Sequence, residues 1–321
     1  VDPSSRRPAL IHSLLVAHHG RLVLEEYFYG FDHDTPHDIR SAGKTLGSVM
    51  LGTAMQRGLP VSPQTRAYEL LAGMAPFANP DPRKAHMTLA HLLTETSGLA
   101  CNDYDDASPG NEGVMQSQSA QPDWWKYALD LPMAHEPGER YAYCSANINL
   151  IGAALRTATH MPVVDFFDRA IARPLQFGPY HWNLMPNGEG YLGGGAQMRP
   201  RDLLKIGQLY LNGGVWNGHR IVPRAWVQLS TSALQLINEQ TTGVDAETFA
   251  NSYLRGADGY GWHRNGVRVG DRTVECYEAN GNGGQLLIVA PEYDLAVVLT
   301  GGNFGQGGIW LRWRDDIVGD S

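Results

Sequence analysis

A serine and a lysine three residues apart, Ser41 and Lys44, form an S-x-x-K pattern. On a helix, residues i and i+3 share one face, so the hydroxyl and the amine can meet. A serine hydroxyl becomes a good nucleophile when a base takes its proton, and a lysine is such a base when burial and nearby positive potential lower its pKa. A helix start supplies part of that potential and a backbone N–H for an oxyanion. The spacing therefore predicts an acyl-transfer nucleophile, although a capping serine with a solvent-exposed lysine would give the same pattern.

The segments around this pair predict how it is positioned. Residues 13–17 and 22–28 have the composition of strands, and the His-His-Gly-Arg between them is typical of a hairpin turn. Apolar residues recur at helical spacing from Leu46 to Ala54, and Gly58 is a suitable stop. Ser41 is thus expected at or near the start of a buried helix that follows an antiparallel hairpin.

The remainder of the chain divides into a helical part and a second set of strands. Residues 61–190 are expected to be mainly helical and irregular, with a polar loop over 101–121 that we predict covers the site. After a helix over 201–211 come predicted strands at 273–278, 285–290 and 295–300, and then a terminal helix over 309–318.

This order predicts an α+β fold with an antiparallel sheet built from both ends of the chain and flanked by helices. Residues 1–60 and 190–321 are expected to form the sheet region. Residues 61–189 would then be the inserted helical region of one compact catalytic unit.

In this arrangement the sequence resembles the serine β-lactamase-like hydrolases, which include class C β-lactamases, carboxylesterases and D-amino-acid peptidases. The resemblance covers nearly the whole chain and rests on several stretches besides the S-x-x-K pattern. They are residues 13–27, the Leu-Leu-Thr-Glu-Thr-Ser-Gly-Leu of 92–99, the Pro-Gly-Glu-Arg-Tyr-Ala-Tyr-Cys-Ser of 137–145, the Gly-Gly-Gly of 193–195, Arg-Asp-Leu at 201–203 and Trp-Asn-Gly at 216–218.

The resemblance implies a third catalytic residue from the family's Y-x-N or Y-x-S motif. Tyr141 and Tyr143 compete for this role, and the family's spacing favours Tyr143, with Ser145 at the Asn position near the substrate. Tyr141 is then expected to be a core aromatic. The Tyr-Cys-Ser triplet is similar to the 6-aminohexanoate-dimer hydrolase branch of the family.

A second implied element is the family's K-T-G strand, which this sequence lacks. The stretch Asn-Gly-Asn-Gly-Gly-Gln at 280–285 stands in its place. The resemblance implies that the N–H of Asn282 completes an oxyanion hole with that of Ser41, and that Gly283, Gly284 and Gln285 lie close to the substrate. In β-lactamases the missing lysine helps to hold the carboxylate of the antibiotic, so the resemblance favours the esterase and amidase branches.

Composition excludes several classes of partner. The 321-residue chain has 43% hydrophobic residues and a net charge of −8, which suits a large core and disfavours nucleic acid. No apolar run is long enough for a membrane span, and no histidine pattern has zinc spacing.

The start lacks a signal peptide and an initiator Met, so an exported chain with its leader removed is one expectation and the compartment stays open. Three cysteines are no disulfide framework, and their odd number leaves at least one thiol unpaired or in an intermolecular bond.

We therefore expect a serine hydrolase that forms an acyl-enzyme with a small ester or amide and needs no metal or organic cofactor. Neutral Lys44, assisted by Tyr143, would take the proton of Ser41. The alternatives are β-lactamase or D-amino-acid peptidase activity, or a binding protein that has lost its chemistry on the same scaffold. Acidic residues of the polar loop, among them Asp103, are candidates to meet a cationic substrate end.

Overall fold

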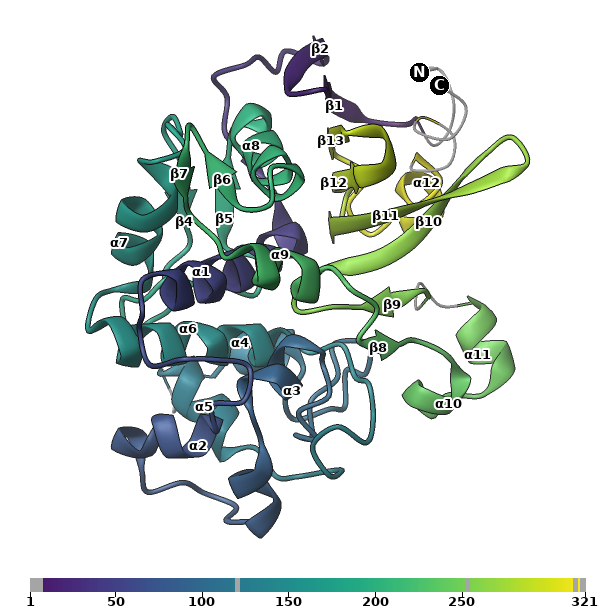
Figure 1. Ribbon diagram of the computed structural model, residues 1–321. Coiled ribbons are helices and arrows are strands. Elements are labelled where there is room, and N and C mark those ends of the chain that lie inside the picture. Colours follow the sequence, from purple (N-terminus) through teal and green to yellow (C-terminus); the bar gives the residue numbers. More distant parts are fainter. Residues whose placement is uncertain (1–7, 119–121, 252–254, 314–316, 318–321) are drawn as a thin grey trace.

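The computed structural model describes residues 8–118, 122–251, 255–313 and 317. An eight-stranded antiparallel sheet has the order β2-β1-β13-β12-β11-β10-β9-β8, so the first hairpin of the chain pairs with its last long strand. Figure 1 shows the purple β1 and β2 beside the yellow β12 and β13. The two long partners at this junction are β1 (Ile11–His18) and β13 (Leu295–Gly301). The expected sheet from both chain ends is confirmed.

The strands and helices have the following bounds. The other strands are β2 (Arg21–Tyr27), β3 (His37–Asp38), β4 (His181–Trp182), β5 (Ala196–Met198), β6 (Val215–Trp216), β7 (His219–Arg220), β8 (Gln235–Leu236), β9 (Ala257–Asp258), β10 (His263–Val269), β11 (Arg272–Gly281) and β12 (Gln285–Ala290). The α-helices are α1 (Lys44–Gln56), α2 (Ala67–Leu70), α3 (Leu89–Leu93), α4 (Glu112–Gln116), α5 (Trp124–Asp130), α6 (Ser145–Thr159), α7 (Val163–Phe167), α8 (Pro200–Leu211), α9 (Arg224–Ser230), α10 (Glu239–Thr242), α11 (Ala246–Asn251) and α12 (Gly307–Trp310). Short helical turns are η1 (Arg40–Gly43), η2 (Ala72–Met74), η3 (Pro82–His86), η4 (Asp168–Ala172) and η5 (Pro291–Tyr293).

Both faces of the sheet are covered. Along β12, Leu287 and Val289 join the main core with α8, whereas Leu286 and Ile288 join a second core that includes Trp310 of α12. Side chains alternate between the two faces of a strand, so a strand buried on both sides is apolar throughout, as the Gln-Leu-Leu-Ile-Val-Ala of β12 nearly is. Because the sheet is buried on both faces, it holds the carboxyl end of β11 in a fixed position.

Helix α1 lies in the middle of the molecule, between the sheet side and α6 (Figure 1). Its residues from Lys44 to Ala54 are all buried. At Gly47 an added Cβ would lie 2.7 Å from Ile148 of α6, so the glycine allows the two helices to approach closely. The helix that follows the candidate nucleophile is thus fixed by packing on every side.

Most of the predicted elements are present, and three differences lie close to the candidate site. The expected loop over 101–121 contains the short helix α4, and residues 119–121 lie outside the described part. The expected terminal helix begins at Gly307 and α12 ends at Trp310, while residues 314–316 and 318 of that prediction are not described. Strand β10 was not expected, although it pairs with β11 along its whole length. No helix in the described ranges is long and apolar enough to cross a membrane.

Candidate active site

Ser41 lies in η1, the tight turn that leads directly into α1. The Nζ of Lys44 is 3.2 Å from the Oγ of Ser41 and donates to the carbonyl oxygen of Gly193 at 2.6 Å. The Lys44 residue is only 7% exposed. An ammonium or amine held by two oxygens inside the protein has a fixed position, so Lys44 Nζ is held beside the hydroxyl of Ser41.

The end of β11 reaches the nucleophile turn through a glycine. A Cβ at Gly281 would lie 2.5 Å from the carbonyl oxygen of Ile39 and 3.0 Å from the nitrogen of Ala42. Only a residue without a side chain therefore allows this approach. Asn282, the next residue, lines the same cavity as Ser41, and its Oδ1 accepts the N–H of Gly305 at 2.8 Å.

Tyr143 approaches Ser41 and Lys44 from the segment just before α6. The Nζ of Lys44 lies 4.8 Å from the centroid of the Tyr143 ring. Burial raises the pKa of Tyr143, and the nearby charge of Lys44 opposes that rise. Tyr141 lines the same cavity and is buried. The structure thus brings Ser41, Lys44 and Tyr143 together.

Four other residues expected near the substrate have different surroundings. Ser145 is fully buried, and its N–H and its hydroxyl both donate to Oδ2 of Asp103 at 2.7 Å. Gln285 is also fully buried and bonds to both the N–H and the carbonyl of Gly301. Gly283 and Gly284 pack against the rings of Phe304 and Trp313. None of these four is among the described residues that line the cavity. Their contacts therefore support the cavity walls from the protein interior.

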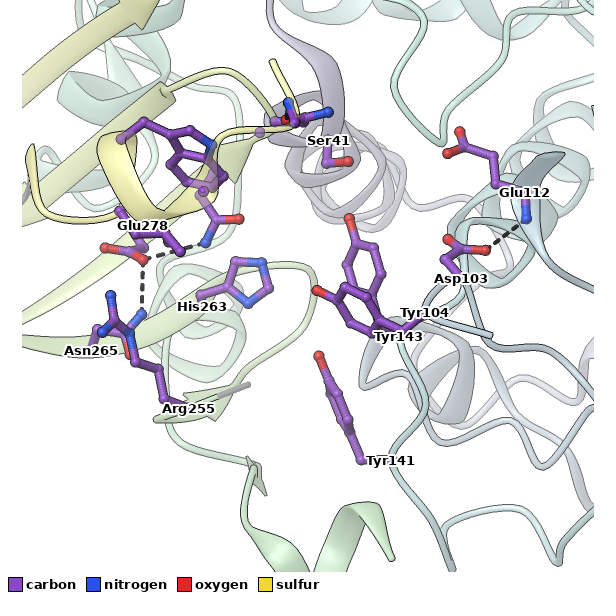
Figure 2. A pocket seen from close by; sticks show the side chains of 17 residues that line it. Ser41, Asp103, Tyr104, Glu112, Tyr141, Tyr143, Arg255, His263, Asn265 and Glu278 are labelled. Atoms are coloured by element: carbon purple, nitrogen blue, oxygen red, sulfur yellow. Dashed lines mark hydrogen bonds between the residues drawn. The ribbon is translucent and has the colours of Figure 1, made fainter. Parts of the chain in front are cut away.

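The cavity has a volume of about 380 Å³ and opens beside Ser41. One wall comes from the polar loop, which contributes Asp103, Tyr104 and Glu112. Figure 2 shows these two carboxylates on one side, Tyr143 and Tyr104 together in the middle, and His263 toward the other side. The rings of Tyr104 and Tyr143 are 5.5 Å apart between centroids. The loop that was predicted to cover the site therefore lines it.

The acidic wall changes the charge state expected for Lys44. Burial alone lowers its pKa, but Tyr143, Glu112 and Asp103 raise it, and the net shift is upward. Burial also raises the pKa of Asp103, while Lys44 and the bonds from Ser145 lower it. The expectation of a lowered Lys44 pKa is corrected here, because the combined effect of Tyr143, Glu112 and Asp103 on the amine outweighs its desolvation.

The opposite end of the cavity contains His263, which pairs with a buried aspartate. Nδ1 of His263 is 2.5 Å from Oδ1 of Asp258. Burial lowers the pKa of His263, but Asp258 raises it more, to about 9. Nearby, the amide of Asn265 donates to Oε1 of Glu278 at 2.8 Å. This end therefore offers ionised and amide groups to a polar part of a ligand.

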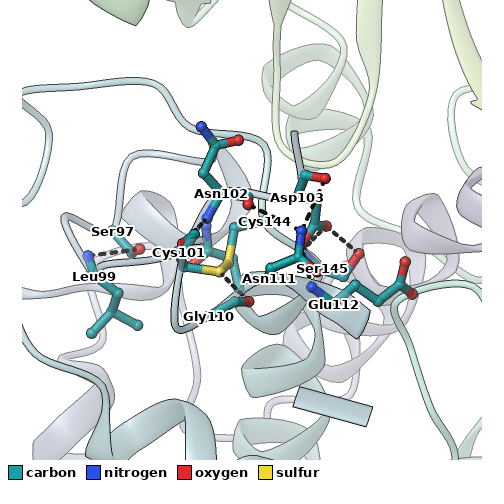
Figure 3. Close-up of a disulfide and its surroundings, with 12 residues drawn as sticks. Ser97, Leu99, Cys101, Asn102, Asp103, Gly110, Asn111, Glu112, Cys144 and Ser145 are labelled. Atoms are coloured by element: carbon teal, nitrogen blue, oxygen red, sulfur yellow. Dashed lines mark hydrogen bonds between the residues drawn. A yellow bond between two sulfur atoms is a disulfide. The ribbon is translucent and has the colours of Figure 1, made fainter. Parts of the chain in front are cut away.

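A disulfide joins Cys101 to Cys144 and thereby ties the start of the polar loop to the residue that follows Tyr143 (Figure 3). The N–H of Asp103 also donates to the carbonyl oxygen of Tyr143 at 2.8 Å. Cys276, the third cysteine, is buried and outside this bond. The loop wall and the Tyr143 segment are thus one cross-linked unit.

Several of these residues were not predicted from the sequence. Glu112 and Tyr104 lie in a loop whose letters alone do not show which side chains face inward, and His263 lies on the unpredicted strand β10. Glu95 was visible within the Thr-Glu-Thr-Ser-Gly motif, but only as part of the resemblance. Within the described residues, no group of three or more His, Cys, Asp or Glu side chains could hold a metal ion.

The fold and the serine–lysine–tyrosine arrangement define the class of protein. Residues 10–304 match the family described as Beta-lactamase, and the chain belongs to this family. It is 26% identical over 222 residues to the 6-aminohexanoate-dimer hydrolase of Paenarthrobacter ureafaciens, which covers 65% of this chain and 54% of that protein. The chain thus spans about half the length of this curated relative.

Solved structures show the same fold at low sequence identity. EstCE1, a hydrolase with promiscuous acyltransferase activity, has a TM-score of 0.73 and 15% identity, covering 96% of this chain and 92% of that one. A family VIII carboxylesterase has a TM-score of 0.72 and 16% identity with the same coverage. The fold is therefore one that serves esterases, other hydrolases and acyltransferases.

Proposed function

We propose that this chain is a serine hydrolase that cleaves a carboxylic ester or amide through an acyl-enzyme on Ser41. The single observation that carries the proposal is the 3.2 Å contact between Lys44 Nζ and the Oγ of Ser41, a residue that lines the same cavity as Tyr143. A nucleophile, a proton acceptor and room for a carbonyl group are thereby adjacent.

Proton transfer in this proposal belongs to Lys44 and Tyr143 as a pair. The pKa shifts of both groups are upward, so both hold their protons at neutral pH. The pair becomes a base once it has lost one proton, whether the remaining form is neutral Lys44 with the phenol or the Lys44 cation with tyrosinate. In that form it takes the proton of Ser41 as Oγ attacks the carbonyl carbon.

In this proposal the same groups complete the acylation of Ser41 and then the hydrolysis of the acyl-enzyme. The N–H groups of Ser41 and Asn282 are proposed to bind the oxyanion, and each such donor is typically worth about 3–4 kcal/mol. The pair returns the proton to the departing alcohol or amine as the bond to the carbonyl carbon breaks. It next takes a proton from water, whose oxygen attacks the acyl-enzyme, and gives that proton to Ser41 Oγ as the acid leaves.

The character of the cavity favours particular substrates. Asp103 and Glu112 stand on the side of Lys44, and the stretch that replaces the family's K-T-G triplet contains no lysine. An anionic substrate such as a β-lactam would meet these carboxylates without a matching cation from this stretch. We therefore propose neutral or cationic esters and amides as the substrate class, and not β-lactams.

Turnover of two chromogenic compounds tests this proposal. Wild-type protein should hydrolyse p-nitrophenyl acetate and should turn over nitrocefin slowly. Ser41→Ala should lose the ester activity, while Ser232→Ala should keep it. Ser232 is a suitable control because its hydroxyl donates to the carbonyl of Leu229 on α9 and it is not among the described residues that line the cavity. Equal ester turnover in wild type and Ser41→Ala would refute the proposal, and a wild type without turnover would favour a binding protein.

A further inference from the structure

A buried carboxyl group, that of Glu95, lies directly behind the segment that carries Tyr143. Glu95 follows helix α3 and is 7% exposed. Its backbone has φ +56°, a left-handed conformation that is rarely adopted by residues with a side chain. A strained backbone held in the core calls for a reason in its contacts.

Those contacts bracket Tyr143 on both sides along the chain. The N–H of Ala142, the residue before it, donates to the carbonyl oxygen of Glu95 at 2.9 Å. The N–H of Cys144, the residue after it, donates to Oε2 of Glu95 at 3.2 Å. One residue therefore holds the backbone immediately before and immediately after the tyrosine.

The same oxygen is also bound to α6. Oε2 of Glu95 accepts the side-chain amide of Asn147 at 2.7 Å, and Asn147 is buried in the first turn of that helix. Neighbouring residues continue the pattern, because the N–H of Gly138 donates to Thr96 and that of Ala134 donates to Gly98. The stretch around Glu95 thus forms hydrogen bonds to the Tyr143 segment at several points and fixes the position of that segment.

We infer that Glu95 is the positioning residue of Tyr143, which it holds by its carbonyl and carboxyl oxygens and influences through the charge of that carboxyl group. This inference rests on the proposed catalytic role of Tyr143. Removal of the carboxyl contacts should let the phenol move relative to Ser41 and Lys44, and small displacements of a catalytic group can lower a rate by about 100-fold.

The charge of Glu95 provides a readout that a purely structural role would not move. Burial raises the pKa of Glu95 to about 8, against the opposing effects of Asn147 and Lys44. Once ionised, Glu95 raises the pKa of Tyr143. Other titratable groups also act on Glu95 or on the tyrosines, and they are present equally in wild type and variants: Lys44, Asp103, Tyr104, Tyr141, Asp258 and His263.

Glu95→Gln separates the two effects. Both hydrogen bonds to the side chain end on one oxygen, so a glutamine amide oxygen can keep both contacts while the charge is lost. Glu95→Ala loses the contacts as well. Glu139→Gln is the matched control, because Glu139 is exposed and its carboxylate accepts the N–H of Glu136 in its own turn.

The experiment is the pH dependence of kcat/KM for p-nitrophenyl acetate and of fluorophosphonate labelling, with circular dichroism and Tm for each variant. Glu95→Gln should keep most of the rate and shift the acidic limb to lower pH, because the charge that raises the pKa of Tyr143 is then absent. Glu95→Ala should lose about 10- to 100-fold in kcat while its circular dichroism spectrum stays similar to that of wild type. Glu139→Gln should match wild type.

Two results would overturn this inference and leave the proposed function intact. One is that both Glu95 variants have the wild-type rate and the wild-type acidic limb of the pH profile. The other is that both variants lose the same amount of rate and neither shows a shift of that limb. If wild type shows neither Ser41-dependent turnover nor labelling, the proposed function fails and the inference falls with it. The three results are distinguishable in the same set of samples.

Discussion

The disulfide between Cys101 and Cys144 leads to a prediction that links stability with activity. Its two residues are separated by 43 positions, and both are buried. The perturbation is the double variant Cys101→Ala with Cys144→Ala, or reduction of the native protein by a dithiol. Reduction converts the disulfide to two thiols while the dithiol is oxidised to its own disulfide.

The magnitude follows from the length of the closed loop. In the chain-entropy account, closing 43 residues removes about 13 cal/mol/K from the unfolded ensemble, which is about 4 kcal/mol at 25 °C. A loss of activity should accompany this loss of stability, because Cys144 adjoins Tyr143 and Cys101 anchors the loop that carries Asp103. We expect kcat/KM to fall by about tenfold or more, since loss of exact orientation is costly.

The assay is denaturant unfolding and p-nitrophenyl acetate turnover under oxidising and reducing conditions. Cys276→Ala is the matched control, because it removes another buried sulfur without removing a cross-link, and it should cost only about 1 kcal/mol. Identical unfolding midpoints and identical turnover for the oxidised protein and the double variant would refute this reasoning.

Three further predictions concern pH and close packing. Because both Lys44 and Tyr143 have raised pKa values, kcat/KM for the ester should rise with pH from 6 to 9, and a flat or falling profile would contradict their role as the base. Gly281→Val should abolish activity, because its side chain would enter the turn that holds Ser41; a variant with the wild-type rate would show that the strand end does not position the nucleophile. His263 has a folded-state pKa of about 9, above its unfolded value, so its pairing with Asp258 stabilises the protein fully below pH 6.5 and this contribution is lost as pH rises through 9. Thermal unfolding of wild type and His263→Gln should converge above that pH, and a constant difference between them would contradict the ion pair.

The elements predicted well from sequence were those with a local signal. The first hairpin has a turn between two apolar runs, and α1 has helical periodicity that ends near Gly58. Strand β10 was missed because its sequence, His-Arg-Asn-Gly-Val-Arg-Val, is largely polar. Its place in the sheet comes from backbone hydrogen bonds to β11, which no local pattern reveals.

The site was predictable in its residue types and less so in its electrostatics. The spacing of Ser41 and Lys44 indicated a contact between their side chains, and the structure has it. The predicted direction of the Lys44 pKa shift was wrong, because the shift depends on Tyr143, Glu112 and Asp103, which come close to Lys44 only through the fold. The pairing of Cys101 with Cys144 likewise depends on a chain path that two cysteines 43 residues apart do not encode locally.

Intact-mass spectrometry after exposure to a fluorophosphonate probe tests whether Ser41 is the nucleophile, with wild type and Ser41→Ala treated side by side. One adduct is expected on wild type and none on Ser41→Ala, since Ser41 is the serine in contact with Lys44. An unlabelled wild type, or equal labelling of both proteins, would contradict the assignment of Ser41 as the nucleophile.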